Sequence, residues 1–216
     1  DYPLSEKGRR PNLNKKFVDD FAAKIGLDFV TEGIGDLEKN FGPEAIFYYA
    51  YAMFHSPTYR SRYAEFLKID FPRLPLTSDI KLFKTLMGYG ETLVQYHLLK
   101  HQSLKGRFGL SVIAFDNLPE KEENRVVHSS KSKRRHDAET QRMYINKTQY
   151  FGGITAEDYE FYVGGYQVLD KWLKDRKNRA LSDEDVQHYK RIVLALRATR
   201  ELMVQIDEAI GSFPVQ

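Results

Sequence analysis

The side chains best suited to bind a charged partner gather in one basic segment near the middle of the chain. Residues 125–136, RVVHSSKSKRRH, contain five lysines or arginines, two histidines and no acid. Cations on a serine-bearing loop contact phosphate oxygens well, because their binding releases counterions from DNA. A solvated loop without a partner has the same composition, so charge alone leaves both interpretations open.

Two other stretches add polar side chains to this candidate site. Residues 92–115 hold no acid, and a short polar run precedes the Gly152–Gly153 turn. Lysine, arginine, asparagine and glutamine are the residue types that bind phosphates or base edges. The predicted DNA-binding residues are therefore Lys131, Lys133, Arg134, Arg135, Arg107, Lys105, Asn146, Lys147 and Gln149.

Common catalytic and cofactor motifs are absent from the sequence. It has no Walker A loop, G-x-S-x-G elbow or H-E-x-x-H motif, and no D/N-P-P-Y/F/W tetrapeptide of adenine methyltransferases. With no cysteine there is neither a thiolate nucleophile nor a Cys-ligated zinc site, and the six histidines lack metal-ligand spacing. The acids at 157–158 and 183–185 lie at predicted element starts, where they stabilise helix dipoles. We expect no catalytic residue, cofactor or metal in this chain.

Composition indicates an ordinary globular protein of 216 residues. It is 42% hydrophobic and 29% charged, with a net charge of +3 that permits nucleic-acid binding without arguing for it. No apolar run reaches the roughly 18 residues of a membrane span, and no signal peptide is visible. We therefore expect a cytoplasmic protein without membrane contact.

Hydrophobic periodicity predicts helices on both sides of a strand-rich region. A stop at Gly26, a Pro43 start and a Ser182 cap mark helix ends. The IDFPRLPL segment at 69–76 is predicted to be extended, because two prolines three residues apart cannot lie inside a helix. Predicted helices run from Asn12 or Asn14 to Gly26, through 43–54, through 57–67, from Thr77 or Ser78 to His101, through 166–177, and from Ser182 to Gly211.

Strands are predicted at 108–115, within the alternating stretch 143–154, and at 159–163. The predicted fold class is α+β, helix-dominant, with a helical scaffold around a small strand-rich insert at 103–165. We expect 43–67, 78–101 and 182–210 to form the rigid body. Residues 117–140 should be the most mobile internal segment, because only two valines between 120 and 136 can be buried. Gly90 has no side chain, so we expect the backbone of a neighbouring element to approach it closely. We expect His97 to be a hydrogen-bonded histidine in the core.

Several long blocks together resemble one protein family. Residues 55–75 read HSPTYRSRYAEFLKIDFPRLP, and residues 164–177 read GGYQVLDKWLKDRK. Similar stretches lie at 11–14, 82–99 and 144–154 and continue to 207. In this order the blocks resemble the C-terminal specificity domain of Type ISP restriction–modification enzymes and related large bacterial helicase–methyltransferase proteins, over nearly the whole chain.

The resemblance implies one polypeptide carrying a nuclease, an ATP-dependent translocase, an adenine methyltransferase and, last, a target-recognition domain. Residues 1–216 would be that last domain, a piece of a longer protein with no catalysis of its own. The implied partners are double-stranded DNA and the methyltransferase domain of the same polypeptide, and the protein would be a monomer. The parent enzyme would use S-adenosylmethionine, ATP and Mg.

The resemblance does not say which residues read bases. The matching blocks look like scaffold, with His55 and Tyr59 to Tyr63 ordering a helix junction and Trp172 packing in the core. Residues 103–142 match least, and a recognition domain varies its reading loops on a fixed frame. Two alternatives stay open. A helical docking scaffold would show an exposed apolar face on 166–210, and a small carboxylate-dependent hydrolase would show a buried acid pair.

Overall fold

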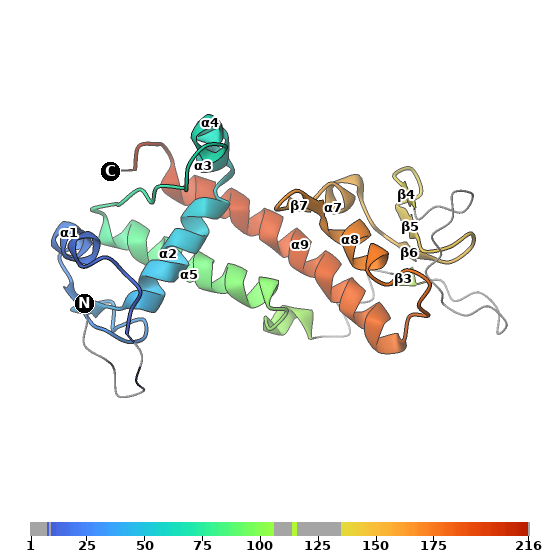
Figure 1. Ribbon diagram of the computed structural model, residues 1–216, viewed down its shortest axis with the longest axis horizontal. Helices are drawn as coiled ribbons and strands as arrows, with labels where there is room; N and C mark the ends of the chain where they lie inside the picture. Colours follow the sequence, from blue (N-terminus) through green and yellow to red (C-terminus); the bar gives the residue numbers. More distant parts are fainter. Residues whose placement is uncertain (1–7, 9, 106–113, 116–134, 216) are drawn as a thin grey trace. The chain divides into compact units, whose positions relative to one another are not determined.

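The computed structural model describes residues 8, 10–105, 114–115 and 135–215, which form two compact units (Figure 1). Unit 1 consists of residues 1–95 together with 200–216, and unit 2 consists of residues 96–199. Helices dominate and the sheets are small and mainly antiparallel, which confirms the predicted α+β class. Among the described helices, none has the length and apolarity that a bilayer crossing needs.

Unit 1 is built from helices and one short pair of strands. Strands β1 and β2 pair in parallel within the glycine-rich stretch 28–42, where no strand was predicted. The elements are α1 (Lys15–Ile25), β1 (Asp28–Phe29), β2 (Asn40–Phe41), α2 (Pro43–His55), α3 (Pro57–Arg62), α4 (Ala64–Leu67), most of α5 (Ile80–His97) and the end of α9 (Asp183–Ile210).

The helix ends of unit 1 follow local capping chemistry. The Asn14 side chain accepts a hydrogen bond from the Phe17 amide at 3.2 Å, as predicted for the start of α1. Helix α5 differs from the prediction at both ends. Asp79 caps it by accepting from the Lys81 amide at 2.7 Å, and it stops at His97, with Leu99 in the left-handed region at φ 54°.

An aromatic cluster forms the core of unit 1. The Phe21 ring lies 5.7 Å from both the Phe41 and Tyr49 rings and 5.3 Å from the Phe83 ring, measured between centroids. All four side chains are buried. Helices α2 and α5 approach closely at Gly90, where an added Cβ would lie 1.8 Å from the Tyr48 carbonyl oxygen. This confirms the predicted close approach.

Two long-range contacts fix the segment that follows α2. Ser56 ends α2 and caps α3, and its hydroxyl donates to the Asp207 carboxylate near the end of α9. Asp207 also accepts from the Thr58 amide at 3.0 Å. The proline segment at 69–76 forms neither helix nor strand, as predicted, and Tyr59 holds it by donating to the Arg73 carbonyl at 2.8 Å.

Unit 2 carries a four-stranded antiparallel sheet in the order β3-β6-β5-β4 and a separate hairpin. The predicted strand at 159–163 is shorter than expected, because Tyr159 ends a helical turn. The elements are η1 (Gln102–Leu104), β3 (Ala114–Phe115), β4 (Arg135–Asp137), β5 (Arg142–Tyr144), β6 (Tyr150–Gly152), α7 (Ala156–Tyr159), β7 (Tyr162–Val163), β8 (Tyr166–Gln167), α8 (Val168–Lys174) and the first part of α9.

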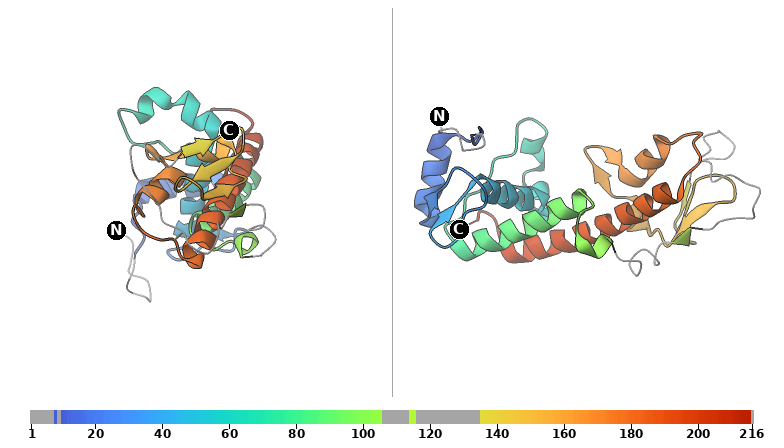
Figure 2. Two further views of the ribbon diagram at one scale, coloured as in Figure 1. Left: turned by 90° about the vertical axis from the view of Figure 1, so that its right-hand side faces the viewer. Right: turned by 90° about the horizontal axis from the view of Figure 1, so that it is seen from below.

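Helix α9 contributes to both units as one uninterrupted helix, visible in two further views (Figure 2). Ser182 caps the helix as predicted and forms a capping box with Asp185, in which each amide donates to the other's side chain at 3.2 Å. Gly211 ends the helix at φ 71°, as predicted. His97 is hydrogen-bonded to Thr199 at 3.0 Å, but it is exposed, so the core placement was wrong.

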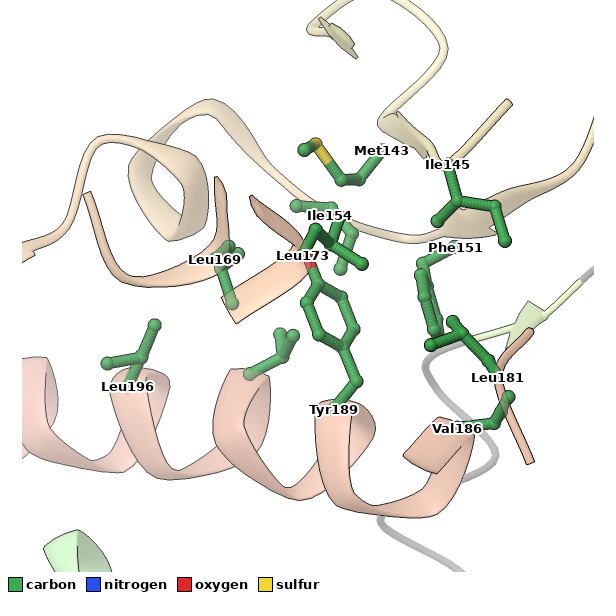
Figure 3. Packing of buried hydrophobic residues seen from close by; sticks show 11 residues of the cluster. Met143, Ile145, Phe151, Ile154, Leu169, Leu173, Leu181, Val186, Tyr189 and Leu196 are labelled. Carbon is green, nitrogen blue, oxygen red and sulfur yellow. The ribbon is translucent and has the colours of Figure 1, made fainter. Parts of the chain in front are cut away.

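The core of unit 2 lies between the sheet, α8 and α9 (Figure 3). Tyr189 is fully buried at its centre, 4.1 Å from the Phe151 ring. Trp172 packs against this cluster from a partly buried position, which confirms its predicted packing. The other buried members are Met143, Ile145, Ile154, Leu169, Leu173, Leu181, Val186, Val193 and Leu196.

Candidate nucleic-acid interface

The two faces of the four-stranded sheet carry different side chains. Met143 and Phe151 are register partners, and both are buried in the core of unit 2. Because successive side chains alternate, Arg142, Tyr144 and Tyr150 lie on the opposite face. The Arg142 guanidinium lies 4.3 Å from the centre of the Tyr150 ring, and the Tyr144 and Tyr150 rings are 5.3 Å apart. Tyr144 is nevertheless buried, and Arg142 and Tyr150 are partly buried. This second face therefore combines aromatic rings with a cation, but its side chains are not exposed for contact with a nucleic acid.

The turn between β5 and β6 presents a single cation on a fixed frame. The Asn146 carboxamide accepts from the Gln149 amide at 2.7 Å and donates to the Gln149 side chain at 2.6 Å. Gln149 is fully buried, whereas Lys147 and Thr148 are exposed at the tip. Among the four residues of this turn, Asn146 and Gln149 shape the backbone and Lys147 faces solvent.

The remaining predicted residues fall at the edges of the described chain. Lys105 is exposed directly after η1. Arg135 begins the edge strand β4, where its backbone is the register partner of Tyr144. Arg107, Lys131, Lys133 and Arg134 lie outside the described residues, as does most of the 117–140 segment predicted to be mobile. The described end of that segment is β4 and a turn, in which the Thr140 amide donates to Asp137 at 3.1 Å.

A buried ion pair ties the sheet to α9. Arg197 donates to the fully buried Asp158 carboxylate at 2.6 Å and to the Gly153 carbonyl at 2.5 Å. Asp158 also completes a capping box with Thr155 at the start of α7. The end of β6, helix α7 and helix α9 are thereby held in one arrangement, which makes the sheet a rigid support for its loops.

A second basic surface lies on α8 and the turn after it, and the sequence analysis missed it. Arg176 stacks on Trp172, with its guanidinium 3.5 Å from the ring centre, and pairs with Asp185 at 3.3 Å. Arg179 pairs with the same carboxylate at 2.6 Å. Lys174 and Lys177 are exposed beside them. The spacing of the cations in KWLKDRKNR was the available signal, but it was interpreted as scaffold.

Asp185 organises these arginines. Burial alone would raise the pKa of its carboxyl, but hydrogen bonds from the Arg179 side chain and the Ser182 amide, followed by the Arg176 contact, outweigh burial and lower the pKa to about 2. A carboxyl with a depressed pKa stabilises the fold above its unfolded pKa, and this contribution is lost as the pH falls toward about 2.

The acids of unit 2 that the structure describes do not converge on a reaction centre. Asp158 and Asp185 are buried, but each is paired with arginine. Glu157, Asp183 and Glu184 are exposed in the first turns of α7 and α9. Within the described ranges, no group of three or more histidines and acids could hold a metal ion. Their positions match the helix-dipole role expected from the sequence.

Comparison with known protein families shows the family to which this chain belongs. Residues 2–205 match the model of the Type ISP C-terminal specificity domain. The chain belongs to this family. No curated protein sequence matches it.

Solved structures show the same fold within larger chains. A cryo-EM structure of a DrdV–DNA complex is 19% identical with a TM-score of 0.56, and the match covers 100% of this chain and 21% of that one. The ATP-dependent Type ISP restriction–modification enzyme LlaBIII bound to DNA is 17% identical with a TM-score of 0.53, and the match covers 85% of this chain and 12% of that one. The specificity-domain chain thus spans only a small part of these solved relatives.

Proposed function

We propose that this chain is the DNA target-recognition domain of a cytoplasmic, monomeric restriction–modification enzyme. The observation that carries the proposal is the match of residues 2–205 to the Type ISP specificity-domain family. The two structural relatives described above are bound to DNA, which supports the same ligand class here. In this role the domain positions a target site for an adenine methyltransferase and performs no chemistry itself.

Unit 2 supplies the frame and the cations that the proposed role needs. The sheet is fixed on α8 and α9, and the Arg197–Asp158 pair anchors its end. Lys147 and Lys105 are exposed, and we propose that they contact DNA phosphates. Asn146 and Gln149 act by holding the turn that carries Lys147. The remaining proposed contacts come from Arg107, Lys131, Lys133, Arg134 and Arg135.

We further propose that unit 1 anchors the domain on the methyltransferase part of the same polypeptide. Phe66, Ile69 and Phe71 are 70%, 86% and 90% exposed, an unusual exposure for three large apolar side chains so close together. We call these three residues the apolar ledge. They adjoin a hollow of about 320 Å³ lined by Tyr59, Tyr63, Phe66, Phe71, Leu74 and Pro75. Solved relatives carry most of their length outside this domain, which supports a partner from the same chain.

The DNA proposal is tested by the salt dependence of binding. Replacing Lys131, Lys133, Arg134 and Arg135 by alanine in the full-length polypeptide should reduce the magnitude of the salt slope by roughly 3–4, near 0.9 per lost phosphate contact. Binding is measured by fluorescence anisotropy at several salt concentrations, against a random duplex and against a duplex selected by the wild-type protein. Loss on both duplexes indicates backbone contacts, and loss on the selected duplex alone indicates base reading.

The matched control removes four exposed lysines of unit 1 and should leave the slope unchanged. These are Lys15, Lys16, Lys39 and Lys68. If the wild-type polypeptide selects no duplex from a random library, target recognition is the wrong function. If it selects one and the variant without Lys131, Lys133, Arg134 and Arg135 keeps the full salt slope, the surface that reads DNA lies elsewhere in the domain.

A further inference from the structure

The β7–β8 hairpin exposes three large apolar side chains at its tip. Tyr162 and Val163 are each 59% exposed, and Tyr166 is 62% exposed. Within five residues, this leaves much more apolar surface in water than isolated surface residues normally do. No residue of the hairpin was among the predicted DNA contacts, so its exposed tip needs its own explanation.

The hairpin presents this tip on a fixed base. Gly164 and Gly165 both adopt positive φ, 54° and 82°, as a two-residue type I′ turn requires at both positions. At the base, the Gln167 side chain donates to the Tyr159 carbonyl and accepts from the Asp170 amide, which caps α8. The tip is therefore held out from unit 2 by its turn geometry and by hydrogen bonds at its base.

The two tyrosines lie on opposite faces of the hairpin. Tyr162 is the register partner of Gln167, and Val163 is the register partner of Tyr166. Cross-strand partners share a face and successive residues alternate, so one ring belongs to each face. Both rings are exposed, which means that a partner contacting both of them must surround the tip. A groove with two walls has this form.

The charge next to the hairpin identifies the kind of groove. The Lys171 ammonium lies 5.7 Å from the centre of the Tyr166 ring and pairs with Asp175 at 2.5 Å, and Lys174 follows one helical turn later on α8. Residues 166–179 contain five cations and two acids. Asp185 holds two of those cations, Arg176 and Arg179, in place. An apolar tip flanked by lysines complements a polyanion whose aromatic base faces become accessible where two neighbouring bases are unstacked.

We propose that the β7–β8 hairpin enters a groove of double-stranded DNA and that its tyrosines stack on bases at a step that it unstacks. This inference rests on the proposed DNA-recognition function and adds a second contact element to it. A two-stranded ribbon fits the major groove, and stacking on an aromatic side chain tolerates any base because every base has a π-face. Lys171 and Lys174 then lie beside the phosphates that border the groove.

The test uses the full-length polypeptide and a duplex that the wild-type protein selects from a random library. Replacing Tyr162 and Tyr166 together by alanine should weaken binding at least fivefold for each stacked ring. Replacing both by phenylalanine keeps the rings and should change the affinity less than twofold. Permanganate should oxidise one or more thymines in the wild-type and phenylalanine complexes, and the alanine variant should lose this reactivity. Phe47→Ala is the control, because Phe47 is 52% exposed in unit 1.

The outcomes separate this inference from the function on which it rests. If the wild-type protein selects no duplex, both fail. If it binds a selected duplex but the alanine variant binds equally well, or no thymine becomes reactive, the hairpin is not a stacking element, while DNA recognition stands. Should the alanine variant misfold by circular dichroism, the single variants Tyr162→Ala and Tyr166→Ala replace it, because a methyltransferase that flips its target adenine also unstacks the opposite thymine in the wild-type complex.

Discussion

At the scale of single residues, two glycines of α5 should respond in opposite ways to alanine. A Cβ at Gly90 would meet the Tyr48 carbonyl oxygen at 1.8 Å, whereas a Cβ at Gly88 meets nothing within 4 Å. Alanine gains about 1 kcal/mol of helix propensity at either position. At Gly90 a steric cost near 3 kcal/mol should exceed that gain and leave a net loss of about 2 kcal/mol.

Urea denaturation of the two single variants measures this difference. Gly88→Ala is the matched control and should be more stable than wild type. A Gly90→Ala variant as stable as wild type would mean that α2 and α5 separate at a cost of only about 1 kcal/mol, which the helix propensity of alanine offsets.

Some residue roles could be read from the sequence and others could not. Gly90 lies on the apolar stripe of its helix, so local spacing was enough to predict a close approach. Gln149 was predicted to contact DNA, but the structure buries it against Asn146. Its residue type is equally suited to base reading and to turn formation, and only the fold of the β5–β6 turn distinguishes the two.

At the scale of elements, removing Arg197 from its ion pair with Asp158 should strongly destabilise unit 2. Asp158 is fully buried, so Arg197→Met leaves its negative charge without the arginine and should reduce the free energy of unfolding by about 3–5 kcal/mol. Adding Asp158→Asn removes that charge and should recover part of the loss. Chemical denaturation of wild type, both single variants and the double variant completes the cycle. A double variant less stable than Arg197→Met would contradict this account.

Element ends were predictable where a single capping residue was present. Gly26 and Ser182 stand alone as caps, and each was found at its expected end. The start of α1 had two candidates, Asn12 and Asn14, and the structure selects Asn14. The start of α5 was misplaced because Thr77, Ser78 and Asp79 can all cap a helix. Helix α7 and strands β1 and β2 were missed, since two to four residues are too few to establish a period.

At the scale of the whole molecule, the apolar ledge should be covered in the full-length protein. Phe71 is 90% exposed and Phe47 is 52% exposed. Hydroxyl-radical footprinting of the full-length polypeptide should nevertheless oxidise Phe66 and Phe71 more slowly than Phe47, if the methyltransferase part lies on the ledge. Faster oxidation of Phe71 than of Phe47 would show that the ledge stays in solvent and that the anchoring surface is elsewhere.

The overall class was predictable and the division into units was not. Periodicity gave the helices and alternation gave the central strands, which suffices for α+β. Unit 1 depends on contacts such as Ser56 with Asp207, which are 151 residues apart in sequence and leave no local pattern. One recognition domain with an insert at 103–165 stays a prediction, as do the proposed rigid body and the mobile segment.

The discontinuity of unit 1 has a consequence for the order of events on the ribosome. Its two parts are residues 1–95 and 200–216, with all of unit 2 between them. Translation proceeds at roughly 5–20 residues per second, and domains fold as their sequences emerge. Unit 2 has its complete sequence by residue 199, while the first part of unit 1 still lacks the Asp207 carboxylate that accepts hydrogen bonds from Thr58 in α3. The nascent chain therefore completes the sequence of unit 2 before that of unit 1. Until residues 200–216 have been synthesised, residues 1–95 lack the segment that completes their unit.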